Sequence, residues 1–362
     1  MNGKILNVRK VGFPGTTGDA RSPESFFFPA CLTSLMECIG EDVRWVTIQA
    51  HGREWTSRLV YKDILAASGM AFGLVWRNHP APNEFSFPLT DDPNDMIRHA
   101  FAWMGYTCEI IERQAGNEAA LWAKITAEID AGRPVLAFDL VGPDCGIVAG
   151  YDADRHALIG WSFFQNDPAV ARAENGMFIA PDWHRNLRKI AVCGPKRDAR
   201  VPLQDVVRRG LAIMERTSIE DGTVLMGLAA YDAWIAFVQN PAFETMDDET
   251  LKNKHGIHDG TVGNHAELRC YLGNFLTGAS QVEGQGTRGD KYLQEAAQCL
   301  DKIHTQCWKA WGVLGGMGSP DAYKGLRDAA KRAELAAVLT AIKNLDRQAA
   351  NALHTWLENV GE

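Results

Sequence analysis

The sequence has no apolar run that approaches the ~20 residues needed to cross a lipid bilayer as a helix. It also has no surplus of basic residues, because 37 lysines and arginines stand against 45 aspartates and glutamates, for a net charge of −8. Surfaces that bind nucleic acid or anionic lipid usually carry the opposite sign. We therefore expect neither a nucleic-acid partner nor a membrane partner.

Paired cysteine motifs are absent as well. The eight cysteines are dispersed, form no CxxC pair, and make no cysteine–histidine cluster with the spacing of a zinc site. Such cysteines are typical of free thiols in a reducing compartment, and residues 1–5 do not open a secretory signal. The glycine-rich stretch 278–289 lacks the Gly-Lys-Ser/Thr ending of a phosphate-binding loop. The sequence thus predicts a cytoplasmic protein that needs no metal and no cofactor.

The 362 residues, 46% of them hydrophobic, are enough for about two domains. Helical patterns in the first part are followed by short strands, bounded by turn residues, between residues 134 and 193. This order predicts an α+β domain with a largely antiparallel sheet over residues 1–197. A charged linker at 194–198 precedes segments with helical periodicity and no convincing strand, so residues 198–362 are predicted to form an all-α domain.

The stretch 26–40 contains the strongest candidate for chemistry. Leu32, Leu35 and Ile39 recur at helical spacing, and Gly40 occupies the place of a glycine that ends a helix. We expect a helix that opens at or near Cys31, just after Pro29. A thiol in the first turn lies near the positive end of the helix dipole, which favours the thiolate. Free cysteine is also among the most buried residue types, so a core role for Cys31 stays open.

Several short motifs resemble one family of proteins. They are CLTSL at 31–35, SGMAF at 68–72, GRPV at 132–135, GIVAGYD at 146–152, YDAW at 231–234 and ELR at 267–269. Together they resemble the papain-like proteins, in particular the butirosin-biosynthesis H-type acyltransferases, which also carry a C-terminal helical extension. The resemblance to the cysteine peptidases that process bacteriocin leaders is more distant. The resemblance implies a papain-like fold for the N-terminal domain.

The resemblance also implies a catalytic set. A thiolate attacks a carbonyl, a histidine moves the proton, and an Asn or Asp orients the histidine. In this sequence the nucleophile falls on Cys31, the histidine position on Asp144 and the orienting position on Ser162. The triad is therefore incomplete. Gly-Pro-Asp-Cys is also an ordinary turn sequence, so Asp144 has a turn role as its alternative.

A histidine from elsewhere in the chain is an alternative source of the base. The candidates are His51, His79, His156 and His184. His255, His258 and His265 lie in the helical half, and their spacing is not a zinc signature.

Two hypotheses about function follow. The first is a cysteine-dependent acyl transfer, or hydrolysis of an amide or thioester, on a small-molecule, peptide or carrier-protein-bound acyl substrate. The second is a catalytically inactive papain-like binding protein that keeps the cleft. Under either hypothesis the helical domain is a candidate surface for a homodimer.

Overall fold

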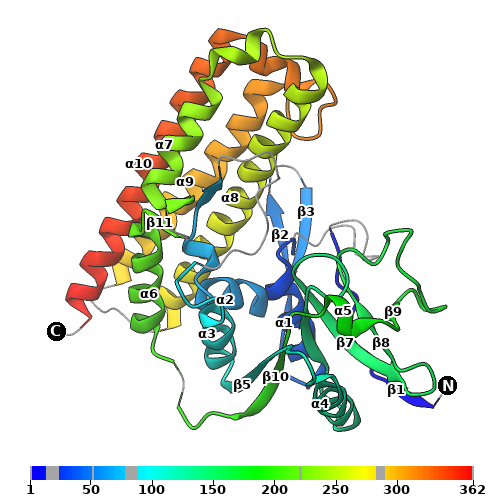
Figure 1. Cartoon of the computed structure of the whole chain (residues 1–362). Coiled ribbons are helices and arrows are strands. Elements are labelled where there is room, and N and C mark those ends of the chain that lie inside the picture. Colours follow the sequence, from blue (N-terminus) through cyan, green and yellow to red (C-terminus); the bar gives the residue numbers. More distant parts are fainter. Residues whose placement is uncertain are drawn as a thin grey trace. The chain divides into compact units, whose positions relative to one another are not determined.

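The structure, a computed structural model, describes residues 2–13, 24–50, 53–77, 89–199, 201–219, 222–282 and 290–360 (Figure 1). The predicted mixed α+β class is confirmed, and the C-terminal half is helical. Every strand pair in the described ranges is antiparallel. None of the helices within these ranges combines the length and the apolar character needed to span a bilayer.

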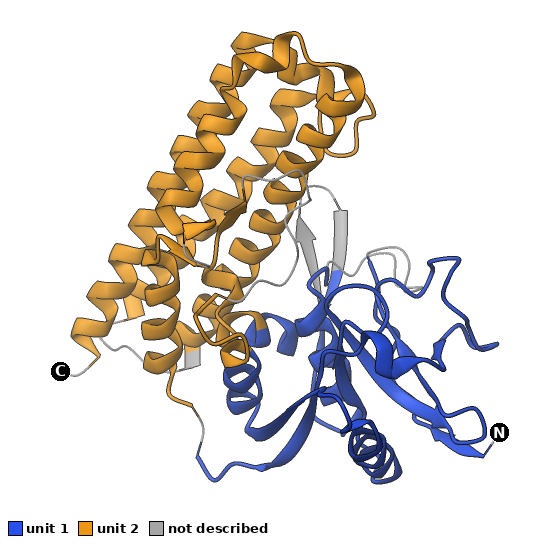
Figure 2. Cartoon of the chain, in the orientation of Figure 1, with its two compact units in different colours: residues 1–64, 97–200 blue, residues 65–96, 201–362 orange. Residues whose placement is uncertain are grey.

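The chain divides into two compact units (Figure 2). Unit 1 contains residues 1–64 and 97–200, and unit 2 contains residues 65–96 and 201–362. Helices α2 (Leu59–Ala67) and α3 (Asp95–Trp103) run across the first two of the three points where the chain passes between units. A segment from the N-terminal half of the sequence thus belongs to the helical unit.

Unit 1 is built on a sheet with the strand order β5-β10-β6-β7-β8-β9. The short N-terminal strand β1 pairs with β7 beside β6. The strands are β1 (Gly3–Ile5), β5 (Tyr106–Glu112), β6 (Val135–Phe138), β7 (Cys145–Asp152), β8 (Ala157–Trp161), β9 (Phe178–Ala180) and β10 (Lys189–Lys196). A separate hairpin joins β2 (Trp45–Ala50) to β3 (Arg53–Arg58). Strand β7 is therefore paired along both edges at the centre of the unit.

Two helices pack on opposite faces of this sheet. Helix α4 (Glu118–Asp130) buries Leu121, Ile125 and Ile129 in a core cluster that also contains Val148 of β7. Helix α1 (Phe27–Cys38) contacts β6 and β7 on the other face of the sheet. Cys145, which contacts Cys31 of α1, belongs to the residues of β7 that alternate with Val148. Successive strand residues point to opposite faces, so α1 and α4 cover different sides. The short helix α5 (Trp183–Asn186) precedes β10.

Unit 2 consists mainly of long helices. They are α6 (Leu203–Glu215), α7 (Gly227–Val238), α8 (Asp248–Val282), α9 (Asp290–Leu314) and α10 (Ala329–Asn359), with the 3-10 helices η1 (Met70–Phe72), η3 (Pro241–Glu244) and η4 (Ala322–Arg327). A small sheet, β11-β12-β4, joins β11 (Ser218–Ile219) and β12 (Val224–Met226) to β4 (Val75–Arg77). The expectation that no strand follows the linker is therefore wrong. Strands of two or three residues are too short to produce a recognisable alternation.

Helix α1 begins earlier than the sequence predicts. It starts at Phe27, so Cys31 is its fifth residue and Pro29 lies inside its first turn. Proline is tolerated there because the first N–H groups of a helix need no partner within it. The predicted end is confirmed: Gly40 has φ of 90° and donates to Glu37 O, while Glu41 donates to Met36 O. Because the dipole effect falls off within the first turn, it acts on Cys31 more weakly than expected.

Candidate functional site

Cys31 lies against the first residue of strand β7. Its side chain is fully buried, with an exposed fraction of 0%. Its Sγ donates to the carbonyl oxygen of Cys145 over 3.5 Å. Phe28, one turn earlier in α1, contacts the ring of Phe138, the residue directly opposite Cys145 on β6. The helix therefore places the predicted nucleophile at the junction of β6 and β7.

The second thiol of this site is Cys145, which the sequence reasoning missed. Burial raises the pKa of Cys145 well above that of an ordinary thiol, and a hydrogen bond with the Cys31 side chain raises it further. The charge of Asp144 acts in the same direction, and that of Lys189 opposes it. Two interacting thiols give up their protons in separate steps. Cys145 therefore remains a thiol, and it can donate a hydrogen bond to Cys31.

Asp144 forms part of the turn that leads into β7. It adopts a left-handed conformation with φ of 75°, and its Oδ1 accepts from the Cys145 N–H over 2.6 Å. Its own N–H donates to Asp139 Oδ1 over 2.8 Å, and its carbonyl accepts from the Asp139 N–H. These contacts are those of a turn residue. They also place a negative charge next to the Cys145 backbone.

Ser162 follows strand β8 and joins two loops. Its Oγ donates to Val141 O over 2.7 Å and accepts from the Phe164 N–H over 3.1 Å. A Cβ added at Gly146 would lie 3.6 Å from the Ser162 Cβ. Gly146 and Cys145 point to opposite faces of β7, so Ser162 lies beside the face that Cys145 does not use.

The alternative histidines of unit 1 that the structure describes do not lie on the Cys31 side of the sheet. His51 and His79 lie outside the described residues. The ring of His156 lies 4.0 Å from that of Trp122, which belongs to α4, and the ring of His184 lies 5.8 Å from that of Trp183. Trp183 belongs to the core cluster under α4, on the sheet face opposite α1. Both histidines therefore sit on the other side of the sheet.

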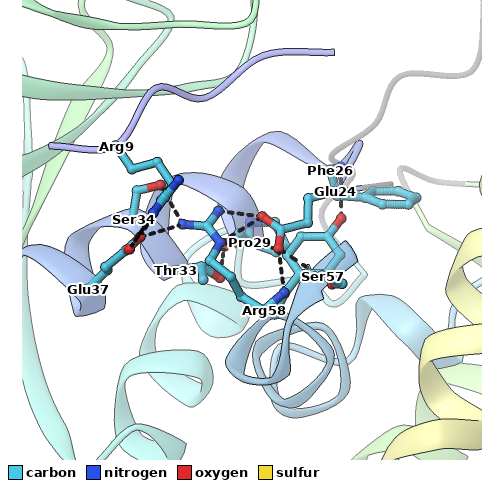
Figure 3. A network of polar contacts seen from close by, with 10 residues as sticks. Arg9, Glu24, Phe26, Pro29, Thr33, Ser34, Glu37, Ser57 and Arg58 are labelled. Carbon is cyan, nitrogen blue, oxygen red and sulfur yellow. Dashed lines mark hydrogen bonds and ion pairs between the residues drawn. The ribbon is translucent and has the colours of Figure 1, made fainter. Parts of the chain in front are cut away.

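A buried polar network connects α1 to the end of β3 and to the residues just before α1 (Figure 3). At its centre Arg58, with an exposed fraction of 3%, forms an ion pair with the buried carboxylate of Glu24. Arg58 Nη1 also donates to Ser34 Oγ over 3.0 Å and to Glu37 over 3.2 Å. Burial opposes the charge on Arg58, but the attraction of Glu24 and then Glu37 outweighs it, so the pKa of Arg58 is raised.

This network ties together three parts of unit 1. Arg58 ends β3, Glu24 precedes α1, and Ser34 lies within α1, three residues after Cys31. Arg9 adds three hydrogen bonds to Glu37 from the N-terminal segment. The Glu24 carboxylate accepts from the Arg58 side chain and from its backbone N–H over 2.9 Å.

A second polar cluster is buried in unit 2, and it contains the YDAW and ELR motifs. Tyr231 donates to Asp346 over 2.9 Å and lies 2.6 Å from His265 Nε2. Arg269 pairs with Asp346 over 2.7 Å and donates to the carbonyls of η1. Trp234 Nε1 donates to His258 Nδ1 over 3.0 Å. These motifs therefore hold α7, α8 and α10 together.

A shallow pocket of about 400 Å³ lies on unit 1 away from Cys31. Lys124 of α4 pairs there with Glu109 over 2.8 Å and with Glu128 over 3.2 Å, and Glu128 also pairs with Arg133 over 2.6 Å. The charges that line it thus satisfy one another. Within the described ranges, no three histidine, cysteine or acidic side chains cluster closely enough to hold a metal ion.

No model of a protein family matches the chain, and no curated protein matches it with significant similarity.

Proposed function

We propose that unit 1 has a papain-like fold and that Cys31 is the nucleophile of an acyl transfer, or of an amide or thioester hydrolysis, with an incomplete triad. One observation carries the proposal: a helix places Cys31 against the start of a central antiparallel strand. That is the position from which a papain-like thiol works with a group on the strand. Asp144 and Ser162 both lie beside the start of this strand and act as structural supports of that end.

The substrate follows from the chemistry of a thiol nucleophile. A thiolate exchanges readily with a thioester, so a carrier-bound or small-molecule acyl thioester is the preferred substrate, with a peptide as the second choice. The eight cysteines are all unpaired, which supports a reducing, cytoplasmic location. The helical domain remains our candidate for a homodimer contact.

The test is the formation of an acyl-enzyme. The chain is incubated with a small acyl thioester, and intact and peptide mass spectrometry locate the adduct. We expect one acyl group on Cys31. Cys31→Ser should abolish it, whereas Cys38→Ser, at the end of the same helix, should leave it unchanged.

The alternative is a binding protein that keeps the fold without the reaction. The full burial of Cys31 favours it, because a reacting thiol must meet its substrate. A folded chain that forms no adduct on Cys31 with any thioester or amide offered, but binds an acyl compound reversibly in calorimetry, would establish this alternative and overturn the proposed reaction.

A further inference from the structure

A row of three side chains crosses the sheet of unit 1 beneath α1. Lys189 of β10 lies directly opposite Phe138 of β6, and Phe138 lies directly opposite Cys145 of β7. Directly opposed residues of antiparallel strands point to the same face. This is the face against which Cys31 packs. A lysine, an aromatic ring and two thiols therefore share one layer.

Lys189 is an unusual residue for this position. Its exposed fraction is only 2%, and its Nζ lies over the Phe138 ring, 5.0 Å from the centroid. The side chain thus reaches from β10 across to β6, the strand that separates it from Cys145. Lysine is almost never buried to this extent unless it is paired, and Glu112 of β5 lies directly opposite Lys189 along the other edge of β10. The charged groups around it are Arg188, Glu112, Asp139 and, on deprotonation, Cys145.

The surroundings of Lys189 lower the pKa of its amine toward physiological pH. Burial, and after it the charge of Arg188, lower the pKa of Lys189 to about 8, although Glu112, Cys145 and Asp139 act in the opposite direction. Arg188 is itself paired with Asp139 over 2.5 Å. At physiological pH both the amine and the ammonium form are accessible, which is the property required of a general base.

We propose that Lys189, together with Cys145, replaces the missing histidine of this site. The S–H bond of Cys31 breaks, and the proton ends on the Lys189 amine, which leaves a thiolate and an ammonium. The Cys145 thiol donates a hydrogen bond to the thiolate. When the acyl intermediate collapses, Lys189 returns the proton to the leaving group. The inference rests on the proposed function, because it supplies the base that this function lacks.

The test is the pH dependence of Cys31 alkylation by iodoacetamide, with peptide mass spectrometry to separate Cys31 from the other seven cysteines. For the wild-type chain we expect an apparent pKa below ~8.5, the value of a free thiol. Lys189→Met removes the amine and should raise the apparent pKa by about one unit, so that alkylation at pH 7 falls about tenfold. Lys189→Arg restores a positive charge beside the thiols and should restore alkylation, but it cannot accept a proton near neutral pH and should therefore not restore acyl transfer.

The matched control is Lys196→Met, which removes an exposed lysine at the end of the same strand and should leave the profile unchanged. Lys189→Met should fold, because it replaces a buried amine with an apolar side chain of similar length; circular dichroism checks this. If Lys189→Met did not fold, Cys145→Ala would carry the test, since it should also raise the apparent pKa of Cys31.

The outcomes separate the two proposals. A low apparent pKa in the wild type that survives both Lys189→Met and Cys145→Ala would overturn the role of Lys189 and leave the proposed function standing. A wild-type profile at or above that of a free thiol would overturn the activated nucleophile itself.

Discussion

At the scale of single residues, the two buried histidines of unit 2 stand out by their incomplete hydrogen bonding. Within the described residues, His258 Nε2 and His265 Nδ1 are buried without a hydrogen-bond partner. Tyr231 donates to Asp346, so its oxygen accepts the proton of His265 Nε2. His258 accepts from Trp234 at Nδ1. Both rings are therefore held in the neutral form.

This burial predicts a loss of stability in acid. Burial, and after it the charge of His255, lower the pKa of His258 to about 3, against about 6.5 in an unfolded chain. Between these two values the unfolded state binds more protons, so the free energy of unfolding falls as the pH falls. His258→Gln keeps an acceptor for Trp234 and removes the titration. Urea unfolding between pH 4.5 and 7 should then show a slope smaller by up to about 1.4 kcal/mol per pH unit.

The control for this prediction is His354→Gln, which removes a half-exposed histidine from α10. It should leave the slope close to that of the wild type. Equal slopes for His258→Gln and the wild type would show that His258 is protonated in the folded state.

The sequence indicated Cys31 as a candidate nucleophile, but it did not indicate the residues that lie beside it. Its helix has a clear periodicity, and a cysteine within it is visible at once. Cys145 and Lys189 share one face of the sheet through the register of three strands, and register is not a local property of any of them. Counting back along the GIVAGYD motif led to Asp144 as the partner position of Cys31. The residue that contacts Cys31 is its neighbour Cys145, one position later in the sequence.

At the scale of secondary structure, the position of α1 depends on the buried ion pair between Arg58 and Glu24. Glu24→Gln leaves the buried Arg58 charge without its main partner, so the free energy of unfolding should fall by about 3–5 kcal/mol. Urea denaturation followed by circular dichroism measures this loss. Glu174→Gln, on an exposed loop, should change it by less than about 0.5 kcal/mol.

A double variant distinguishes the charge from the shape. Arg58→Met with Glu24→Leu removes both charges and should recover much of the stability lost in Glu24→Gln. A loss as large as that of the single variant would mean that the hydrogen bonds to Ser34 and Glu37, rather than an unpaired charge, carry the effect.

Elements were predictable where their pattern was long. Strand β5 and the helices α4, α6 and α9 follow their hydrophobic periodicity closely. The apolar stretch 70–76 does not form one continuous strand, because it contains the 3-10 helix η1 and then the start of β4. Arg269 accounts for part of this, because it donates to the carbonyls of Ala71, Phe72 and Gly73 and so stabilises a turn that the apolar sequence alone does not indicate.

At the scale of the whole molecule, the membership of residues 65–96 in unit 2 gives a direct prediction. Trp76 of β4 is buried and stacks on Trp234 of α7 with ring centroids 6.0 Å apart. Trp76→Ala should cost about 3–5 kcal/mol. Amide hydrogen exchange should accelerate in β12 and α7, while the β5–β10 pair of unit 1 keeps its protection.

The reciprocal variant is Phe178→Ala, in the core cluster of unit 1. It should accelerate exchange in β8 and spare α7. Equal acceleration in both units from either variant would mean that the two units unfold as one.

The same segment was hard to assign from the sequence. Residues 65–96 precede the predicted boundary at 197–198 and read like the helices and strands around them. Their partners, β12 and α7, lie far along the chain. Because local pattern reports only which face of an element is apolar, it cannot say which distant element covers that face.

The pairing of β4 with β12 also orders events on the ribosome. Strand β4 is synthesised roughly 10–30 s before β12 at ordinary elongation rates. During that interval Phe72, Leu74 and Trp76, all buried in the finished protein, have no surface to cover them. The nascent chain therefore exposes an apolar segment between the two parts of unit 1, whose own residues are all synthesised before β12. That segment is where a ribosome-associated chaperone would bind, and where interrupted translation would leave an aggregation-prone fragment.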